Sequence, residues 1–189
     1  TLFVEQPLTR ALTLDPSTRQ TVLEIRKRKP LVIDEADGAT DSFARAFNIG
    51  YNGVSHKNCK GFFKSLANFC LCAFFNEQGK AAFQTGEDLS NMPLVAIQQD
   101  FTALGLLKIN HCERNGHHYG FGLSHLSADE KEQALRVHPD LYTKRGDEAF
   151  LNIRGGQIEC GSLQTAGFGV AFEPDWNQLV PLDDWKIVW

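Results

Sequence analysis

Apolar positions along the first 110 residues follow two alternating patterns. Short apolar runs of strand length are separated by longer segments whose apolar residues recur three and four positions apart, as on the buried face of a helix. The short runs predict strands at residues 1–4, 31–34, 54–56, 81–85 and 106–110. The longer segments predict helices at residues 15–29, 40–49, 62–78 and 93–104, the last of them capped by Gly105. Strict alternation of strands and helices is typical of a parallel sheet, so this part of the chain is predicted to be α/β.

The pattern changes in the last third of the chain. Residues Ser127 to Glu130 have the order of a capping box, which predicts a helix that begins there and reaches about Val137. A hairpin is predicted around Arg154-Gly155-Gly156, between residues 150–153 and 157–160. The final segment is rich in aromatic residues and prolines, which indicates an extended tail. We therefore expect a strand-and-helix part over residues 1–126 and a C-terminal helix, hairpin and tail over residues 127–189.

Composition excludes several classes of protein. The chain has 189 residues, of which 42% are hydrophobic, enough for one substantial core in one or two domains. A formal net charge of −4 argues against a nucleic-acid partner, and no apolar run approaches the ~20 residues of a membrane span. Five cysteines without a CxxC pair are typical of a reduced, cytoplasmic protein.

Ionisable residues follow two neighbouring apolar runs. Asp34 and Glu35 come directly after LVI, and His56 and Lys57 come directly after GVS. The strands of a strand–helix–strand unit lie parallel in one sheet, so both polar ends are expected at the same rim. Acids close to a lysine at such a rim suggest a bound cation beside a base that exchanges protons.

Four motifs carry a resemblance to a known family. VEQPL at residues 4–8, VIDEADG at 32–38, GYNGVSHKNCKG at 50–61 and the closing GFGVAFEPD resemble the enolase superfamily, in particular its muconate-lactonizing and dipeptide-epimerase branch. The resemblance implies a (β/α)8 barrel with magnesium ligands at the ends of successive strands. It assigns Glu5 and Asp34 as two of these ligands and Lys57 as the lysine that ends the sixth strand.

The resemblance covers only part of such a barrel. It matches about strands four to eight, so it implies that the missing N-terminal half of the barrel and a capping domain act as partners. The tail aromatics Phe168, Phe172, Trp176 and Trp185 are then expected to pack on that missing part or on a neighbouring chain. The sequence KNCKGFF also lacks the paired glycines that usually follow the family's lysine. Homo-oligomer formation is left open.

The implied chemistry requires these residue types. Removal of the proton next to a carboxylate gives an enediolate, whose added charge can be stabilised by Mg²⁺ on carboxylate oxygens. A lysine accepts that proton only when it is neutral, and burial beside a cation would lower its pKa from ~10.4. We therefore expect Lys57 to transfer the proton of a small carboxylate substrate by epimerisation, cycloisomerisation or dehydration.

Further residues are candidates for substrate binding, each with a structural alternative. They are Lys60, Glu87, Arg114, His117 and His118. Lys60 is expected to point away from the mouth of the barrel with Lys64, Glu87 could instead cap the following helix, and the histidines could belong to a surface turn at Asn115-Gly116. A zinc site from Cys112 and the nearby histidines is discounted because its spacing matches no standard pattern.

The principal candidates have structural alternatives as well. Glu5 and Asp34 could be helix caps or members of rim salt bridges, and Lys57 could be a structural lysine paired with Asp34. His56 points away from Lys57 on the strand and is expected to be a buried, hydrogen-bonded histidine. The alternative function is a catalytically inactive barrel that binds a carboxylate or a partner protein.

Overall fold

The computed structural model describes residues 2–88, 94–114 and 121–186. Contacts divide the chain into two compact units, which are described separately here. Unit 1 comprises residues 1–91 and 103–116, and unit 2 comprises residues 92–102 and 117–189. This division differs from the boundary expected at residue 126, because two segments before that residue belong with unit 2.

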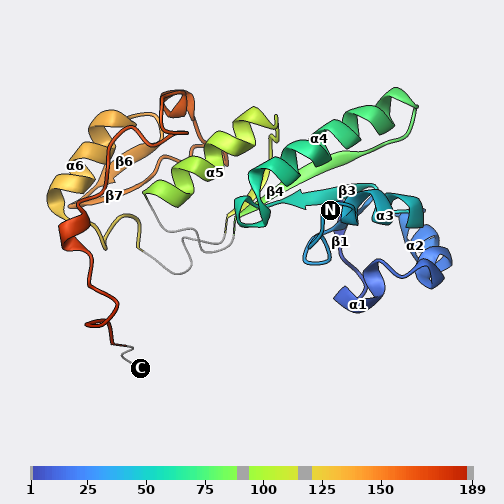
Figure 1. Cartoon of the computed structure of the whole chain (residues 1–189). Coiled ribbons are helices and arrows are strands. Elements are labelled where there is room, and N and C mark those ends of the chain that lie inside the picture. Colours follow the sequence, from blue (N-terminus) through green and yellow to red (C-terminus); the bar gives the residue numbers. More distant parts are fainter. Residues whose placement is uncertain (1, 89–93, 115–120, 187–189) are drawn as a thin grey trace. The chain divides into compact units, whose positions relative to one another are not determined.

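Unit 1 is built on a five-stranded parallel sheet (Figure 1). The strands lie side by side in chain order, and every neighbouring pair is parallel. Their bounds are β1 Val4–Glu5, β2 Leu31–Ile33, β3 Gly53–His56, β4 Phe83–Asp88 and β5 Cys112–Arg114. The α/β class and the parallel sheet predicted from the alternating pattern are confirmed.

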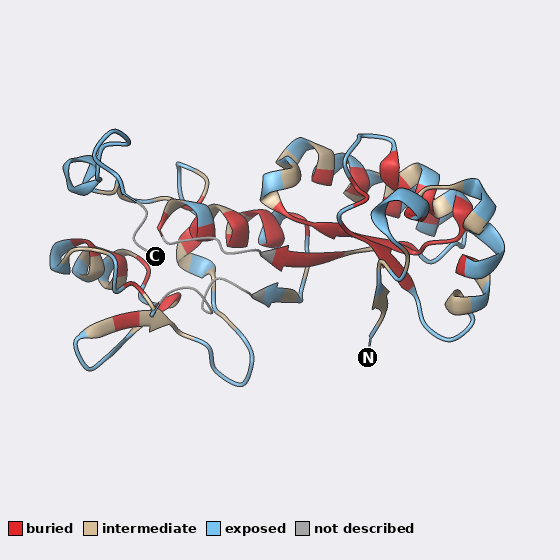
Figure 2. Cartoon of the chain, turned by 90° about the horizontal axis from the view of Figure 1, so that it is seen from below, coloured by how far each residue is buried: buried red, intermediate tan, exposed pale blue. Residues whose placement is uncertain are grey.

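One face of this sheet packs against helices. The helices are α1 Arg10–Thr13, α2 Arg19–Arg26, α3 Ser42–Ile49 and α4 Phe62–Glu77. The core between helices and sheet includes Leu31 and Val54 from the strands and Val22, Phe43 and Phe75 from the helices. Figure 2 shows the central strands as buried. Because side chains alternate along a strand, the residues between these core positions point to the opposite, inner face of the sheet.

The sheet is curled about its inner face. The ring of Phe3, beside β1, lies 5.9 Å from the ring of Phe83 on β4 and 6.0 Å from that of His111, just before β5. A Cβ atom at Gly53 would lie 2.9 Å from the Phe83 carbonyl oxygen, so the inner face has no room for a side chain there. Side chains from the first and last strands can therefore meet, although these strands are not neighbours.

The last strand of unit 1 begins later than predicted. Helix α5 spans Val95–Leu106 and passes through Gly105, which was expected to cap it. The backbone leaves the helical path at Lys108, two residues after the helix, where φ has a left-handed value of 55°. The N–H of Ile109 donates back to the carbonyl of Leu104 at 3.0 Å. This is a Schellman ending with lysine in the usual place of glycine. Residues 106–110 are therefore used by the helix end, and the predicted strand over them is wrong.

Unit 2 contains one further helix and a hairpin. Helix α6, Ala128–Val137, begins with the predicted capping box: the N–H of Glu130 donates to Ser127 Oγ, and the N–H of Ser127 donates to Glu130 Oε2. The hairpin, however, pairs β6 Tyr142–Arg145 with β7 Glu148–Leu151.

Of the hairpin predicted around residues 154–156, the turn is present, but the strands predicted on either side of it do not pair with each other. In the observed register, Arg145 lies opposite Glu148, which leaves Gly146 and Asp147 as a two-residue turn. Gly146 has a φ of 62°, the left-handed conformation that such turns require. Near Gly155 only an isolated bridge joins Arg154 to Gln157.

The C-terminal tail has little regular structure in its described part. It contains short 3-10 turns at Gly161–Leu163 and Trp176–Gln178. Trp176 and Trp185 are 60% and 56% exposed, and Phe168 and Phe172 are partly buried. The aromatic tail is therefore not fully covered within the described chain, and what covers it stays a prediction. None of the helices described in either unit has the length and apolarity needed to cross a membrane.

Candidate functional site

The candidate site lies at the carboxyl end of the parallel sheet, on its inner face. Four ionisable residues end four successive strands there: Glu5 on β1, Asp34 after β2, Lys57 after β3 and Glu87 on β4. Each of these four residues follows an inner-face residue by two positions. Because side chains alternate along a strand, all four side chains point toward the inner face. Parallel pairing then gathers residues that are up to 82 positions apart in the sequence (87 minus 5).

Asp34 is the centre of the cluster. It is 1% exposed, and both of its carboxylate oxygens are bound by lysines. Lys57 Nζ lies 2.7 Å from Oδ2, and Lys60 Nζ lies 2.6 Å from Oδ1. Burial acts to raise the pKa of Asp34, but hydrogen bonds and charge from the two lysines outweigh it and lower the pKa to about 2. Asp34 is therefore an anion at neutral pH.

Lys57 is held between two acids. Its Nζ lies 2.7 Å from Asp34 Oδ2 and 2.9 Å from Glu87 Oε2, and the residue is 4% exposed. Burial acts to lower the pKa of Lys57, as expected from the sequence. The hydrogen bonds and charges of Asp34 and Glu87 outweigh burial, and the pKa of Lys57 is raised above its usual value. The expected lowering of this pKa is therefore wrong for the arrangement seen here. The amine is protonated while both acids hold it.

Three carboxylates converge beside Lys57. One oxygen from each of Glu5, Asp34 and Glu87 lies within 4.8 Å of the others. Glu5 and Asp34 thus point to one place, as expected, and Glu87 joins them instead of capping the next helix. Carboxylate oxygens at this spacing are the hard ligands that Mg²⁺ prefers. In the described residues, these acids form the group that could hold a metal ion.

The acids of the cluster oppose one another's ionisation. Although Glu5 is exposed as a residue, partial desolvation of its carboxylate and the charges of Asp34 and Glu87 raise its pKa to about 7. Burial also raises the pKa of Glu87, with the charges of Asp34 and Glu113 adding to the rise against the opposing effect of Lys57. The site therefore holds more negative charge than its lysines neutralise, and a cation or a proton would relieve it.

Lys60 and Lys64 do not leave the rim together. Residues Asn58–Lys60 form a 3-10 turn, η2, which brings Lys60 back over Asp34, where its Nζ also lies 2.8 Å from the Asp34 carbonyl oxygen. Lys64, on α4, instead lies 2.7 Å from Asp37 Oδ2. The expectation that both point away from the site is wrong for Lys60. Lys60 was predicted to bind substrate, and its ammonium binds the Asp34 carboxylate in this structure.

The remaining predicted site residues are only partly described. Arg114 ends β5, next to the strand of Glu87, but its side chain lies outside the described part of the chain. His117 and His118, which are also two of the residues of the alternative zinc site, lie outside the described residues. Glu113, directly before Arg114, was not predicted, although its charge acts on both Glu5 and Glu87. Its position at the end of a parallel strand is the signal that would have found it.

His56 is buried on the other face of β3, as predicted. Its Nδ1 lies 2.7 Å from Ser65 Oγ on α4, and burial lowers its pKa to about 4, with Lys60 adding to the effect. It is neutral at pH 7 and packs between sheet and helix. The cluster on the inner face does not include it.

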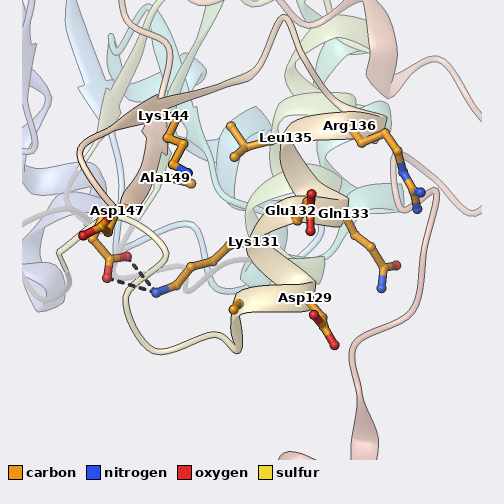
Figure 3. Close-up of a pocket in the computed structure, with 11 residues that line it drawn as sticks. Asp129, Lys131, Glu132, Gln133, Leu135, Arg136, Lys144, Asp147 and Ala149 are labelled. Atoms are coloured by element: carbon orange, nitrogen blue, oxygen red, sulfur yellow. Dashed lines mark hydrogen bonds and ion pairs between the residues drawn. The ribbon is translucent and has the colours of Figure 1, made fainter.

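Two cavities lie near charged groups. In unit 1, a cavity of about 310 Å³ beside the acids is lined by Phe3, Glu5, Thr85, Glu87 and Glu113, among others. In unit 2, a hollow of about 910 Å³ lies between α6 and the hairpin (Figure 3). Its walls carry both signs of charge, and Lys131 Nζ is paired with Glu148 Oε2 at 2.8 Å. Only the first cavity adjoins a group of converging acids among the described residues.

Comparison with known proteins identifies no relative of this chain. No family model matches it, and no curated protein or solved structure matches it. The resemblance in the motifs therefore stays a prediction, and the class that the fold and site define is an α/β protein with an acid–lysine cluster at the carboxyl rim of a curled parallel sheet.

Proposed function

We propose that this chain belongs to a (β/α)8-barrel enzyme of the enolase superfamily, which removes the proton next to a carboxylate with the help of Mg²⁺. The observation that supports this most is the convergence of Glu5, Asp34 and Glu87 beside Lys57. A curled sheet whose five strands lie parallel and in chain order is compatible with such a barrel. In the described chain, the edge strands β1 and β5 each pair with one neighbour only. In the proposed protein, further strands would pair with these edges and close the barrel, and a capping domain would cover it.

Glu5, Asp34 and Glu87 would hold the metal ion. Their oxygens have the right chemistry, and the pKa values of Glu5 and Glu87 are raised first by burial and then by the neighbouring acids, whose negative charge a divalent cation would neutralise. When bound, Mg²⁺ would stabilise the negative charge that develops on the substrate. Lys60 would remain on Asp34 Oδ1 and keep this acid ionised.

Lys57 would take the proton from the substrate and return it. It can do so only after Asp34 and Glu87 stop holding it in its charged form, because both ion pairs favour protonation. The proposal therefore requires these carboxylates to turn from the amine in the complete, substrate-bound protein. Arg114, His117 and His118 stay candidates for binding a small-molecule carboxylate, and the outcome of the reaction stays open. A cytoplasmic location also stays part of the proposal.

The test is exchange of the substrate's α-proton with deuterated solvent. It is run on the full-length protein with Mg²⁺ over a panel of carboxylates, for the parent, Lys57→Ala and Lys64→Ala. Lys64 is the matched control, because it is another largely buried lysine paired with an aspartate in unit 1. Lys57→Ala should slow exchange by about 10²–10⁴-fold, the usual contribution of a general base, while Lys64→Ala should stay near the parent rate. Exchange that persists in Lys57→Ala would make Lys57 structural.

A second candidate is a catalytically inactive barrel that binds a carboxylate or a protein. The double ion pair of Lys57 favours it, since buried lysines that serve structure are held in this way. This candidate predicts that the full-length parent protein binds members of the carboxylate panel in a thermal-shift assay but exchanges no α-proton from any of them. Exchange by the parent would exclude it.

A further inference from the structure

Gln6 joins the two strands that carry Glu5 and Asp34. It follows Glu5 directly at the end of β1, and its N–H donates to the carbonyl of Val32 on β2 at 2.8 Å. Its backbone has a φ of 30°, a left-handed conformation that is uncommon for residues other than glycine. This conformation marks a position where the surrounding contacts outweigh local backbone preference.

The side chain of Gln6 makes three hydrogen bonds to the segment after β2. Its Oε1 accepts from the N–H of Asp34 at 3.1 Å and from the N–H of Ala36 at 2.8 Å. Its Nε2 donates to Glu35 Oε2 at 2.9 Å. One amide group thus satisfies two backbone donors that no strand or helix pairs, and it also binds the acid between them.

These bonds fix the backbone that carries Asp34. The N–H of Asp34 is held from one side by Gln6, while its carboxylate is held from the other by Lys57 and Lys60. Because Gln6 and Glu5 are consecutive, a shift of the loop after β2 would move Asp34 relative to Glu5. Side chains that orient metal ligands in this way commonly affect metal affinity as strongly as a weak ligand does.

We propose that Gln6 is a positioning residue of the site, which sets the placement of Asp34 relative to Glu5 through its two backbone hydrogen bonds. The inference deepens the proposed function and rests on it, since it assumes that the two acids share one cation. It assigns no contact between Gln6 and the metal or the substrate. Glutamate at this position would keep the two accepted bonds but would face the Glu35 carboxylate, which now accepts from Gln6 Nε2, so Gln6→Glu is made together with Glu35→Gln throughout. Methionine would keep the length of the side chain and lose all three bonds.

The experiment uses the full-length protein, as the test of the proposed function does. It compares the parent with Gln6→Met, Gln6→Glu and Gln84→Met. Gln84 is the matched control, because it lies on the outer face of β4 in the same unit and its Nε2 donates to the Ser65 carbonyl at 3.0 Å, away from the acids. Two quantities are measured: amide hydrogen exchange by NMR, residue by residue, and the dissociation constant for Mn²⁺ by calorimetry.

Gln6→Met should speed exchange at Asp34 and Ala36 alone and raise the Mn²⁺ dissociation constant by about 10–100-fold. Gln6→Glu should restore protection at both amides and bring the constant within about threefold of the parent, and Gln84→Met should leave the constant unchanged. The inference is overturned if Gln6→Met and Gln84→Met bind Mn²⁺ equally, or if Gln6→Glu weakens binding as much as Gln6→Met does.

Failure of the proposed function gives a different result. If the full-length parent binds no Mn²⁺, the metal-dependent function fails, and the amide exchange alone decides the role of Gln6. Loss of protection confined to Asp34 and Ala36 in Gln6→Met, restored in Gln6→Glu, would then still support positioning. Unchanged exchange at these two amides would overturn it.

Discussion

Three carboxylates, two in unit 2 and one in unit 1, are held by different kinds of partner. In unit 2, Glu130 accepts hydrogen bonds from the N–H groups of Ser127 and Asp175, and Asp140 accepts them from the N–H groups of Leu141 and Ser162. In unit 1, Asp34 binds two lysines and faces other carboxylates. Backbone donors tie an acid to one local structure, whereas side-chain charges can rearrange when a ligand binds.

The pKa values differ in the same way. Burial acts to raise the pKa of Glu130, but hydrogen bonds from Ser127 and Asp175 lower it overall. Desolvation and neighbouring acids raise the pKa of Glu5 to about 7. A carboxylate whose pKa is raised toward neutrality by desolvation and by other carboxylates is more often part of a site than one whose pKa is lowered by backbone donors. Substitutions of the acids in unit 1 should therefore affect function and stability, whereas those of Glu130 and Asp140 in unit 2 should affect stability alone.

The largest difference is expected on removal of one acid from each unit. Asp34→Ala leaves the largely buried Lys60 without a carboxylate partner and Lys57 with only Glu87. The loss should lower the free energy of unfolding of unit 1 by about 3–5 kcal/mol. Asp140→Ala removes two hydrogen bonds to backbone groups and should cost about 1–2 kcal/mol. Hydrogen exchange measures both, with the amides of β2 and β3 reporting on unit 1 and those of β6 and β7 on unit 2. Equal losses would contradict the comparison.

A smaller difference is expected from pH, through two similar histidines. His56 in unit 1 and His138 in unit 2 each place Nδ1 on a serine hydroxyl, at 2.7 and 3.0 Å, and burial lowers both pKa values. A lowered pKa means that the unfolded chain binds the proton more tightly. The stabilisation is therefore present above about pH 6.5 and is lost as the pH falls toward the folded-state value.

For His56 the folded-state pKa of about 4 sets the size of this effect. The shift from 6.5 corresponds to about 3 kcal/mol of the free energy of unfolding. His56→Gln should remove this part of the pH dependence in unit 1 between pH 7 and 4, and His138→Gln should act only in unit 2. The measurement is the free energy of opening of each unit across this range. A pH profile that His56→Gln leaves unchanged would count against a buried, neutral His56.

The smallest effect is expected at the capping box of α6. Ser127→Ala removes the hydroxyl that accepts from the N–H of Glu130 and should cost about 1 kcal/mol. Asp129→Ala is the control, because this acid lies exposed in the same helical turn. Urea denaturation followed by circular dichroism compares the two. A greater loss in Asp129→Ala would mean that helix charge, and not the cap, stabilises this end.

Local features of the fold were predictable where one short stretch decides the structure. The capping box at Ser127 fixes the start of α6 because both of its bonds lie within four residues. The end of α5 was missed, because Lys108 adopts the left-handed conformation that the sequence suggested for Gly105. The hairpin was misplaced because Gly155 and Gly146 are both turn residues, and only the pairing of Arg145 with Glu148 selects the second.

For the strands of Glu5, Asp34 and Lys57, the sequence by itself determined which residues lie at the strand ends and on which face they lie. Strand polarity and the two-residue period were enough to bring Glu5, Asp34 and Lys57 to one rim. Only the tertiary structure decided which atoms meet there: Glu87 on Lys57, Lys60 on Asp34, and Gln6 on the backbone after β2. The direction of the pKa shift of Lys57 depends on these distances, because burial and neighbouring carboxylates act in opposite directions. Their balance is set by contacts among residues far apart in the chain, which no local pattern specifies.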